Sequence, residues 1–407
     1  MTLLERFLKY ISIDTKSDPS KKTIPTTRGQ LELAKILVNE LAELNVDDIS
    51  FDQENCYVYA RIAGNDDMPK IGFISHLDTS PDVPGNNIET RIINNYNGRN
   101  IRLNKEVKLK VNDNKDLKNH VGKTLITSRG DTLLGADDKA GIAEVMQMIA
   151  TIKKTSMEHG DIYICFTPDE EIGNGTLNLD YEKFAPDFAY TIDGSSVGEL
   201  SYENFNAATI KIEIKGINTH TGSAKGKMVN AIQIATLINS LLPDERPENT
   251  DGYEGFFHLK KLNGDESNAH MEYLIRDFNQ DNFAKRKMII HEIVKQFNQK
   301  YNNCIEMDIK DTYYNMSNII SKNSEVIVGT KKAIKECGID PIVKPIRGGT
   351  DGALVTYNGI ICPNIGTGGH NFHSIYEYVT LEDMEKVVEI LISIINQFSK
   401  NKEKIIR

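Results

Sequence analysis

Apolar residues in the first half of the chain recur at two spacings, one typical of helices and the other of buried strands. Helical spacing runs through residues 31–44 and 139–153, where apolar side chains return every three or four positions. Short apolar runs at 71–75 (IGFIS), 161–167 and 188–192 (FAYTI) fit strands that are covered on both faces. Strands that alternate with helices predict an α/β fold, with a mostly parallel sheet and helices on both of its faces.

The pattern changes in the middle of the chain. The segments 208–216 (ATIKIEIKG) and 304–314 (CIEMDIKDTYY) alternate between apolar and polar residues, as strands with one exposed face do. Helical spacing covers 228–242, which ends before a proline, and a charged stretch at 282–300. Two strands and two helices of this kind predict a compact α+β unit.

After this unit the α/β pattern returns, and it ends in a helix from Leu381 to Phe398. One α/β domain interrupted by an inserted domain accounts for both patterns. Residues 94–119, which are rich in Asn and Lys, fit a surface hairpin to which we assign no chemistry. The predicted boundaries are 1–207 and 317–407 for the two parts of the α/β domain and 208–316 for the insertion.

Composition agrees with a two-domain globular protein. At 407 residues the chain exceeds the usual size of a single hydrophobic core. Its 39% hydrophobic and 26% charged residues are ordinary for a soluble protein. The formal net charge of −10 argues against general attraction to nucleic acid or to an anionic membrane, because phosphate binding requires concentrated lysine and arginine.

Targeting signals and cysteine usage point to the cytoplasm. No apolar run approaches the roughly 20 residues that span a bilayer. The N-terminus is not a signal peptide, since Glu5, Arg6 and Lys9 interrupt any apolar core, and helical spacing from Leu3 to Ile11 predicts an amphipathic helix instead. The five cysteines are odd in number, far apart and in no metal-binding spacing, which indicates a reducing compartment.

Three consecutive carboxylates, Asp169, Glu170 and Glu171, follow the predicted strand at 161–167 in the segment TPDEEIG. Carboxylates this close raise one another's pKa unless a positive group lies among them. The segment is therefore either a site that holds a positive group or a solvated acidic turn, and other segments of the chain bear on the choice.

Four further segments place side chains of metal-binding type at the end of a predicted strand or the start of a helix, where sites assemble in open α/β sheets. In extended backbone, residues two apart point the same way, so Asp78 can lie beside His76 and accept its second ring N–H. Each segment alone also fits an ordinary role, such as a helix cap for an aspartate. The residues are His76 and Asp78 in SHLDTSPD, Asp137 and Asp138 in LLGADDKAG, Asp193 in TIDGS, and His370 and His373 in IGTGGHNFHS.

In the order H-x-D, DD-K-x-G, EE-x-G, D-G and a late histidine, these motifs resemble the M20 family of zinc metallopeptidases, and within it the tripeptide aminopeptidases. The resemblance spans nearly the whole chain. Segments in its second half separate tripeptide aminopeptidases from deacetylases and carboxypeptidases of the same fold, and they include AKGKMVNA, GYEGF, YLIRDF, YYNM and PIRGGTDGA.

The resemblance implies two Zn²⁺ ions per subunit. His76 and Asp193 would hold the first ion, Glu171 and His373 would hold the second, and Asp137 would bridge the two.

Further expectations concern the neighbours of these ligands. The resemblance implies that Asp78 orients His76 and that the peptide bond between Asp137 and Asp138 is cis. His373 occupies the position of the family's metal ligand, and His370 is the alternative candidate for that ligand.

The same resemblance does not require Glu170 as a metal ligand. Two zinc ions carry four positive charges, which three ligand carboxylates and one hydroxide ion balance without it. Glu170 would therefore act as a general base that takes a proton from the attacking water and passes it to the departing amine.

The resemblance also implies roles in the inserted domain, which would serve as a lid and in dimerisation, so that a homodimer is an option. His220, in GINTHTGSAKG, occupies the lid-histidine position and would stabilise a negative intermediate. A threonine follows it where a proline is frequent, and a surface-turn histidine is the alternative. Outside the predicted insertion, Arg347 in IRGGTDG has the side-chain chemistry to pair bidentately with a substrate's terminal carboxylate.

The leading hypothesis is a cytoplasmic metallo-exopeptidase that releases the N-terminal residue from tripeptides and that binds neither nucleic acid nor membrane. Another M20-type amidohydrolase, a dipeptidase or an N-acyl amino acid deacylase, is the alternative within this fold. A zinc-stabilised binding protein without turnover is a third hypothesis, and the presence of both Glu170 and Asp78 argues against it.

Overall fold

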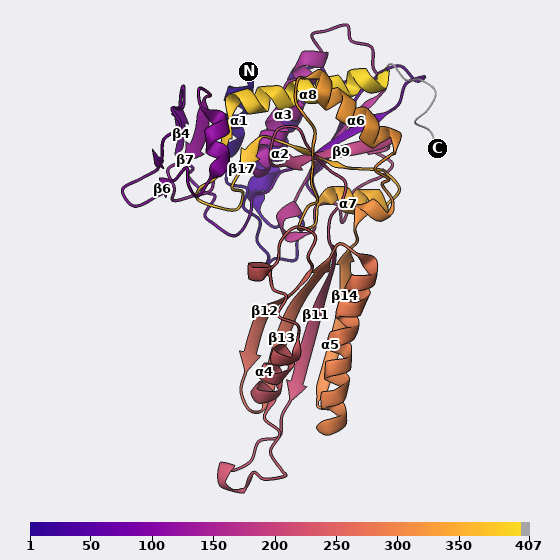
Figure 1. Ribbon diagram of the computed structural model, residues 1–407. Helices are drawn as coiled ribbons and strands as arrows, with labels where there is room; N and C mark the ends of the chain where they lie inside the picture. Colours follow the sequence, from indigo (N-terminus) through magenta and orange to yellow (C-terminus); the bar gives the residue numbers. More distant parts are fainter. Residues whose placement is uncertain (400–407) are drawn as a thin grey trace. The chain divides into compact units, whose positions relative to one another are not determined.

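A computed structural model describes residues 1–399, and the contacts within it divide the chain into two units (Figure 1). The predicted insertion, residues 208–316, lies within the second of these. Unit 1 consists of Met1–Tyr202, Ile319–Lys344 and the chain from Thr350 onward, and unit 2 consists of Glu203–Asn318 and Pro345–Gly349.

Unit 1 is built on an eight-stranded mixed sheet. Its strands lie in the order β1 (Asp48–Asp52), β2 (Tyr57–Ile62), β8 (Ile162–Thr167), β3 (Ile71–His76), β9 (Phe188–Gly194), β16 (Asn364–Gly366), β10 (Glu199–Ser201) and β15 (Ile342–Val343). The central strands β8, β3, β9 and β16 run parallel to one another, as the sequence predicts, whereas β10 is antiparallel to β16. The edge strands β1 and β2 are antiparallel.

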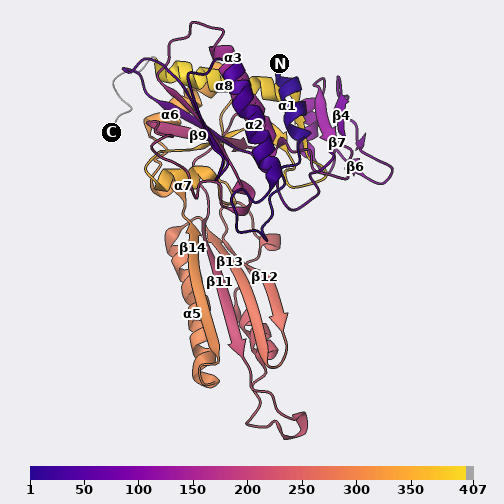
Figure 2. The same cartoon turned by 180° about the vertical axis from the view of Figure 1, so that it is seen from behind.

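Helices cover both faces of this sheet. Alternate residues of a strand point to opposite sides, so the contacts of each residue show which helix covers which side. On one side, Phe188 of β9 packs against Phe398 with ring centroids 4.7 Å apart, and Tyr190 shares a hydrogen bond with Thr330. On the other side, Val355 joins the apolar cluster beneath β3 and β9. The helices of unit 1, seen from two sides in Figures 1 and 2, are α1 (Leu3–Ile11), α2 (Arg28–Glu43), α3 (Ala136–Ile152), α6 (Glu325–Glu336), α7 (Asp351–Tyr357) and α8 (Leu381–Ser399).

The local pattern explains why these helices form where they do. α1 begins at a capping box in which Thr2 and Glu5 exchange hydrogen bonds, and its apolar stripe buries Phe7 and Ile11. The helices predicted at the N-terminus, in the first half and at the end of the chain are confirmed as α1, α2, α3 and α8.

A smaller sheet in unit 1 includes part of the glycine-rich loop that carries His370 and His373. It consists of β17 (Gly369–His370), β18 (Tyr378–Thr380), β7 (Leu125–Ser128) and β4 (Thr90–Ile93). The predicted surface hairpin is confirmed as β5 (Ile101–Arg102) and β6 (Lys108–Leu109), and the 3₁₀ helix η1 (Lys115–His120) follows it. Apolar side chains of this region pack against Tyr378.

Unit 2 is an antiparallel four-stranded sheet that packs against two helices. Its elements are β12 (Phe256–Gly264), β13 (Asn268–Asp277), β11 (Asn206–Lys215) and β14 (Ile305–Tyr313) in sheet order, with α4 (Ala231–Leu241) and α5 (Gln280–Lys300). The predicted alternation in β11 is confirmed, since Ile210, Ile212 and Ile214 are buried and the residues between them are exposed. The expectation of two strands here is wrong, because β12 and β13 pair with one another, a contact that the pattern of a single segment does not disclose.

Several smaller features complete the described chain. Within residues 1–399, no helix combines the length and the apolar character that crossing a membrane requires. All five cysteines are free, and Cys165 is a buried thiol of β8. Short 3₁₀ segments are η2 (Glu170–Ile172), η3 (Thr221–Ser223), η4 (Pro247–Asn249) and η5 (Met316–Asn318).

Candidate active site

The predicted metal ligands lie at the carboxyl ends of adjacent strands in unit 1. β3 lies between β8 and β9 and runs parallel to both. His76 is the last residue of β3, the Asp169–Glu171 loop follows β8, and Asp193 lies near the end of β9. Parallel strands bring their carboxyl ends to one edge of the sheet, which is where α/β folds assemble sites.

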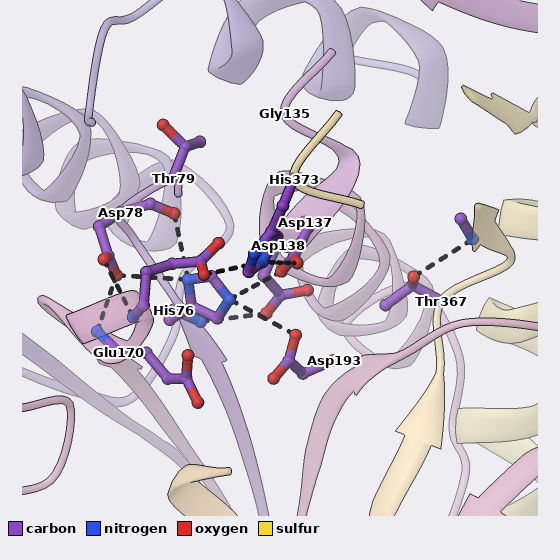
Figure 3. Close-up of polar contacts among 12 residues, drawn as sticks. His76, Asp78, Thr79, Gly135, Asp137, Asp138, Glu170, Asp193, Thr367 and His373 are labelled. Atoms are coloured by element: carbon purple, nitrogen blue, oxygen red, sulfur yellow. Dashed lines mark hydrogen bonds and ion pairs between the residues drawn. The ribbon is translucent and has the colours of Figure 1, made fainter. Parts of the chain in front are cut away.

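His76 is surrounded by carboxylates (Figure 3). Its Nε2 lies 2.9 Å from Oδ1 of Asp137 and 3.4 Å from Oδ1 of Asp193. Its Nδ1 lies 3.1 Å from the backbone oxygen of Asp78 and 3.3 Å from the carboxylate of the same residue. Nε2 therefore faces the site, while Asp78 contacts the other ring nitrogen, as its predicted orienting role requires.

His373 contacts the second oxygen of Asp137. Its Nε2 lies 3.1 Å from Oδ2 of Asp137 and 2.8 Å from Oε2 of Glu171, and its Nδ1 lies 3.3 Å from Oδ2 of Asp82. Asp137 thus directs one carboxylate oxygen toward His76 and the other toward His373. A ligand that bridges two cations needs this arrangement.

His370 is engaged in a different part of unit 1. Its ring stacks on Tyr378 with centroids 4.8 Å apart and meets the ring of His120 edge-on at 5.0 Å. Burial and His120 lower the pKa of His370 to about 4. Of the two histidines in the glycine-rich loop, His373 is the one that contacts the carboxylates of the site.

Two groups of side chains could each hold a cation, because their possible ligand atoms all lie within 4.8 Å of one another. The first group is His76, Asp137 and Glu171, and the second is His76, Glu170 and Asp193. Glu170, the predicted base, therefore lies at the same place as the predicted ligands.

Asp78 also holds the loop that carries the two glutamates. Its Oδ1 accepts a hydrogen bond from the backbone N–H of Glu170 at 2.9 Å, and its Oδ2 accepts one from the N–H of Glu171 at 3.2 Å (Figure 3). Because Asp78 is fully buried, these bonds are shielded from water and connect the position of His76 to that of the loop.

The electrostatics of this space fit bound cations. Burial and Asp137 raise the pKa of Glu171 to about 8 and that of Asp193 to about 6. Burial and Asp193 raise the pKa of Glu170 well above its usual value. Oε1 of Glu171 is buried without a hydrogen-bond partner. A divalent cation would favour the ionised carboxylates and occupy that oxygen, and imidazole with carboxylate is a donor set that zinc accepts.

The two aspartates at the start of α3 have different environments. The peptide bond between Asp137 and Asp138 is cis, which confirms the prediction. Asp138 is fully buried, and its Oδ2 accepts a hydrogen bond from the backbone N–H of His76 at 3.0 Å. The helix-cap interpretation is wrong for both, since the carboxylate of Asp137 contacts His76 and His373, and Oδ1 of Asp138 has no hydrogen-bond partner.

Glu377 takes the place of a cap, and nothing in the sequence singled it out. Its carboxylate accepts hydrogen bonds from the backbone N–H groups of Leu134 at 2.7 Å, Gly135 at 2.9 Å and Asp137 at 3.0 Å. Glu377 lies 240 residues along the chain from Asp137, so local pattern could not reveal the contact. It fixes the backbone that presents the bridging carboxylate.

The two predicted substrate-binding residues lie in unit 2, whereas the predicted ligands lie in unit 1. His220 is exposed, and its Nδ1 accepts a hydrogen bond from the backbone N–H of Gly222 at 3.2 Å. The guanidinium of Arg347 donates to the backbone oxygens of Gly252 at 2.7 Å and Glu254 at 3.0 Å, and it lies over the ring of Phe205. Both residues have local contacts, and their contacts with substrate stay predictions.

Comparison with known sequences gives consistent matches. The profile of peptidase family M20/M25/M40 matches residues 129–397. Peptidase T of Clostridium perfringens strain 13 is 48% identical over 401 residues, which cover 97% of this chain and 98% of the relative. Peptidase T of Caldanaerobacter subterraneus subsp. tengcongensis is 48% identical over 405 residues, which cover 98% of this chain and 99% of the relative.

Solved structures share the fold over nearly the full length. Aminopeptidase PepT from Bacillus cereus matches with a TM-score of 0.78 at 22% identity and covers 97% of this chain and 98% of its own. A tripeptidase from Staphylococcus aureus matches with a TM-score of 0.79 at 21% identity and covers 98% of both chains. The family profile spans more than half of the sequence and the relatives nearly all of it, so this chain belongs to peptidase family M20/M25/M40.

Proposed function

We propose that this chain is a dinuclear-zinc aminopeptidase that releases the N-terminal residue from tripeptides. The observation that carries the proposal is the meeting of His76, Asp137, Glu171, Asp193 and His373 within hydrogen-bonding distances around one space at the sheet edge. The substrate class rests on the similar proteins, which are named Peptidase T, aminopeptidase and tripeptidase.

Two cations would divide the ligands between them. His76 and Asp193 would hold one zinc ion, Glu171 and His373 would hold the other, and Asp137 would bridge the pair. A structural neighbour from Bacillus subtilis, described as a dinuclear metal-binding M20 peptidase, supports the number. When bound, two such ions supply positive charge that polarises a carbonyl and lowers the pKa of water.

Glu170 is the proposed general base. Its carboxylate accepts a proton as a water oxygen bonds to the scissile carbonyl carbon, and it returns that proton to the amine nitrogen as the carbon–nitrogen bond breaks. Its place beside His76 and Asp193 supports this role, and so does the hydrogen bond that holds its backbone to Asp78. Glu170 could also act as a ligand from that place, and the two roles are separable by experiment.

Glu170→Gln tests the assignment, because glutamine keeps the size of the side chain but cannot accept the proton. We expect kcat on a tripeptide to fall by about 10²–10⁴-fold, the usual contribution of a general base, while two metal ions per subunit are retained. Glu389→Gln, an exposed glutamate on α8, is the matched control and should leave both quantities unchanged. Loss of metal would assign Glu170 as a ligand, and retained activity would contradict its catalytic role.

Contacts with the two ends of the substrate are part of the proposal. His220 would hydrogen-bond the negative oxygen of the tetrahedral intermediate, and Arg347 would pair with the terminal carboxylate. The carbonyl contacts of Arg347 give it a structural role as the alternative. Arg347→Lys should raise KM for tripeptides if the carboxylate pairing is correct, and should lower only stability if it is not.

Another M20-type amidohydrolase activity is the competing function. A panel of Leu-Gly-Gly, dipeptides and N-acetyl amino acids decides between them, with metal content measured on the same samples. Cleavage of the dipeptides or acetylated amino acids as fast as the tripeptide would contradict tripeptide aminopeptidase activity. Binding of the tripeptide without cleavage would favour a zinc-stabilised binding protein.

Location and assembly complete the proposal. The free cysteines fit a reducing compartment, and we place the enzyme in the cytoplasm. The inserted domain would act as a lid and would carry the contact of a homodimer. Sedimentation of the purified protein tests the assembly directly.

A further inference from the structure

Asp169, the first carboxylate of the acidic loop, has a role that neither metal binding nor proton transfer explains. It is fully buried. Its Oδ2 accepts a hydrogen bond from the backbone N–H of Thr26 at 2.8 Å, and its Oδ1 accepts bonds from the hydroxyl of Thr26 at 2.5 Å and from Nε2 of Gln30 at 2.7 Å. The N–H of Asp169 donates in return to Oε1 of Gln30 at 3.1 Å. Such a fully satisfied buried network holds its members in one arrangement.

The backbone at Asp169 turns sharply just before the catalytic residue. Asp169 has φ 51° and ψ 31°, the left-handed region, which is uncommon for residues with a side chain although aspartate enters it more readily than most. Its carbonyl accepts a hydrogen bond from the N–H of Asn174 at 3.0 Å, which closes the loop. The next two N–H groups, those of Glu170 and Glu171, donate to Asp78. Thr26 and Gln30, through Asp169, and Asp78 therefore hold consecutive residues of the loop from two different parts of the chain.

The partner of Asp169 is itself firmly held. Thr26 lies in the arm, the segment of residues 12–27 that connects α1 to α2. The arm pairs with Thr79, the residue after Asp78, through hydrogen bonds from Ser17 N to Thr79 O at 3.1 Å and from Thr79 N to Thr15 O at 3.3 Å. The arm therefore contacts Asp169 and the neighbour of Asp78, and the carboxylates of Asp169 and Asp78 hold the loop that carries Glu170.

Thr26 is the link within the arm. Its hydroxyl donates to Asp169 and accepts the backbone N–H of Asp18 at 3.0 Å. The start of α2 closes on the arm as well, since a Cβ at Gly29 would lie 1.6 Å from the carbonyl oxygen of Asp14, and only glycine permits that approach. The arm is thus a braced segment on which Asp169 can hold the loop.

We propose that Asp169, held by Thr26 and Gln30, is a positioning residue that sets the direction of the Glu170 carboxylate through the backbone between them. The inference rests on the proposed role of Glu170 as general base. A residue that only stabilised the fold would change the melting temperature without a separate effect on kcat. A positioning residue changes kcat in molecules that are still folded and still hold metal.

The matched pair Thr26→Val and Thr26→Ser separates these roles. Valine keeps the shape of threonine and removes the hydroxyl, whereas serine keeps the hydroxyl. We expect Thr26→Val to lower kcat on a tripeptide by about tenfold to hundredfold, with KM within about twofold and metal content unchanged, because small misplacements of a catalytic group have effects of this size. Thr26→Ser should retain most of the activity.

Thr330→Val is the control for loss of a buried threonine hydroxyl elsewhere in unit 1. The hydroxyl of Thr330 is buried, donates to the backbone oxygen of Val326 at 2.6 Å and shares a hydrogen bond with Tyr190. This variant should lose thermal stability to a similar extent and keep its kcat. If Thr26→Val does not fold, Gln30→Met removes the other partner of Asp169 and carries the same expectations.

Hydrogen exchange in the metal-free protein gives a readout that does not depend on activity. Amides of residues 169–174 should exchange about tenfold faster in Thr26→Val than in Thr26→Ser, because the loop opens more often once Asp169 loses the hydrogen bond from the hydroxyl of Thr26. Equal kcat and equal exchange in the two Thr26 variants would overturn the inference. If Thr26→Val shows faster exchange but the wild type does not cleave tripeptides, the result would support the role of Thr26 in holding the loop and would refute the proposed function instead.

Discussion

Glu377→Gln should loosen the metal centre although Glu377 is not a predicted ligand. The side chain is 1% exposed, and its two oxygens accept three backbone N–H groups at the start of α3, those of Leu134, Gly135 and Asp137. Glutamine offers one acceptor oxygen and an NH₂ group that only donates. At least one of the three N–H groups therefore loses its partner and faces another donor.

The contacts allow the size of the effect to be worked out. Oε2 accepts two of the bonds and Oε1 accepts the third, from Asp137, so an amide that keeps the pair leaves the N–H of Asp137 unpaired. Leaving a buried N–H without its partner costs about 1–3 kcal/mol, and we expect the free energy of unfolding to fall by about this amount. Asp137 contacts both His76 and His373, so metal affinity should fall by about tenfold to hundredfold, as for other residues that orient ligands.

Competition with a chelator measures the metal affinity, and denaturant unfolding followed by circular dichroism measures the stability. Glu382→Gln is the matched control, because the carboxylate of Glu382 also accepts a backbone N–H, that of Thr124, at 2.8 and 2.9 Å. It should leave metal affinity unchanged. Wild-type metal affinity in Glu377→Gln would refute the idea that this carboxylate holds Asp137 in place.

Two other predictions concern His373 and Asp383. His373→Phe should remove at least one metal ion per subunit, whereas His370→Phe should leave metal content unchanged because a phenyl ring can keep the stacking on Tyr378; equal metal loss in both would contradict the assignment. Burial opposes ionisation of Asp383, yet hydrogen bonds from His120 and Lys123 lower its pKa to about 2. Since the pKa is depressed in the folded state, the stabilisation is present above about pH 4 and lost as the pH falls toward 2. Asp383→Asn should therefore cost about 2 kcal/mol at neutral pH and progressively less below pH 4, and a pH-independent difference in unfolding free energy would show this pairing to be unimportant.

Elements with a strong local pattern could be predicted from sequence. α3 and α8 carry apolar residues at helical spacing, and β11 alternates between buried and exposed positions, so each segment contains its own signal. Strand pairing is different, because partners lie far apart in the chain. β12 pairs with β13, and β7 lies between β4 and β18, and these arrangements depend on contacts between segments rather than on the pattern within one.

For the site, too, sequence identified some residues and missed others. The types and order of His76, Asp137, Glu171, Asp193 and His373 were readable because the short motifs that contain them resemble those of the M20 family. The residues that hold these motifs in place were not readable.

Composition and hydrophobic spacing were enough to specify an α/β chain with an insertion, and the motifs were enough to nominate the groups that meet at the sheet edge. Folding alone decided which distant side chains support those groups: Glu377 beneath Asp137, and Thr26 with Gln30 against Asp169. The reason is physical. Helical or strand periodicity is a property of neighbours in sequence, whereas a buried carboxylate takes whatever donors the packed chain brings to it, and here those lie about 140 to 240 residues away.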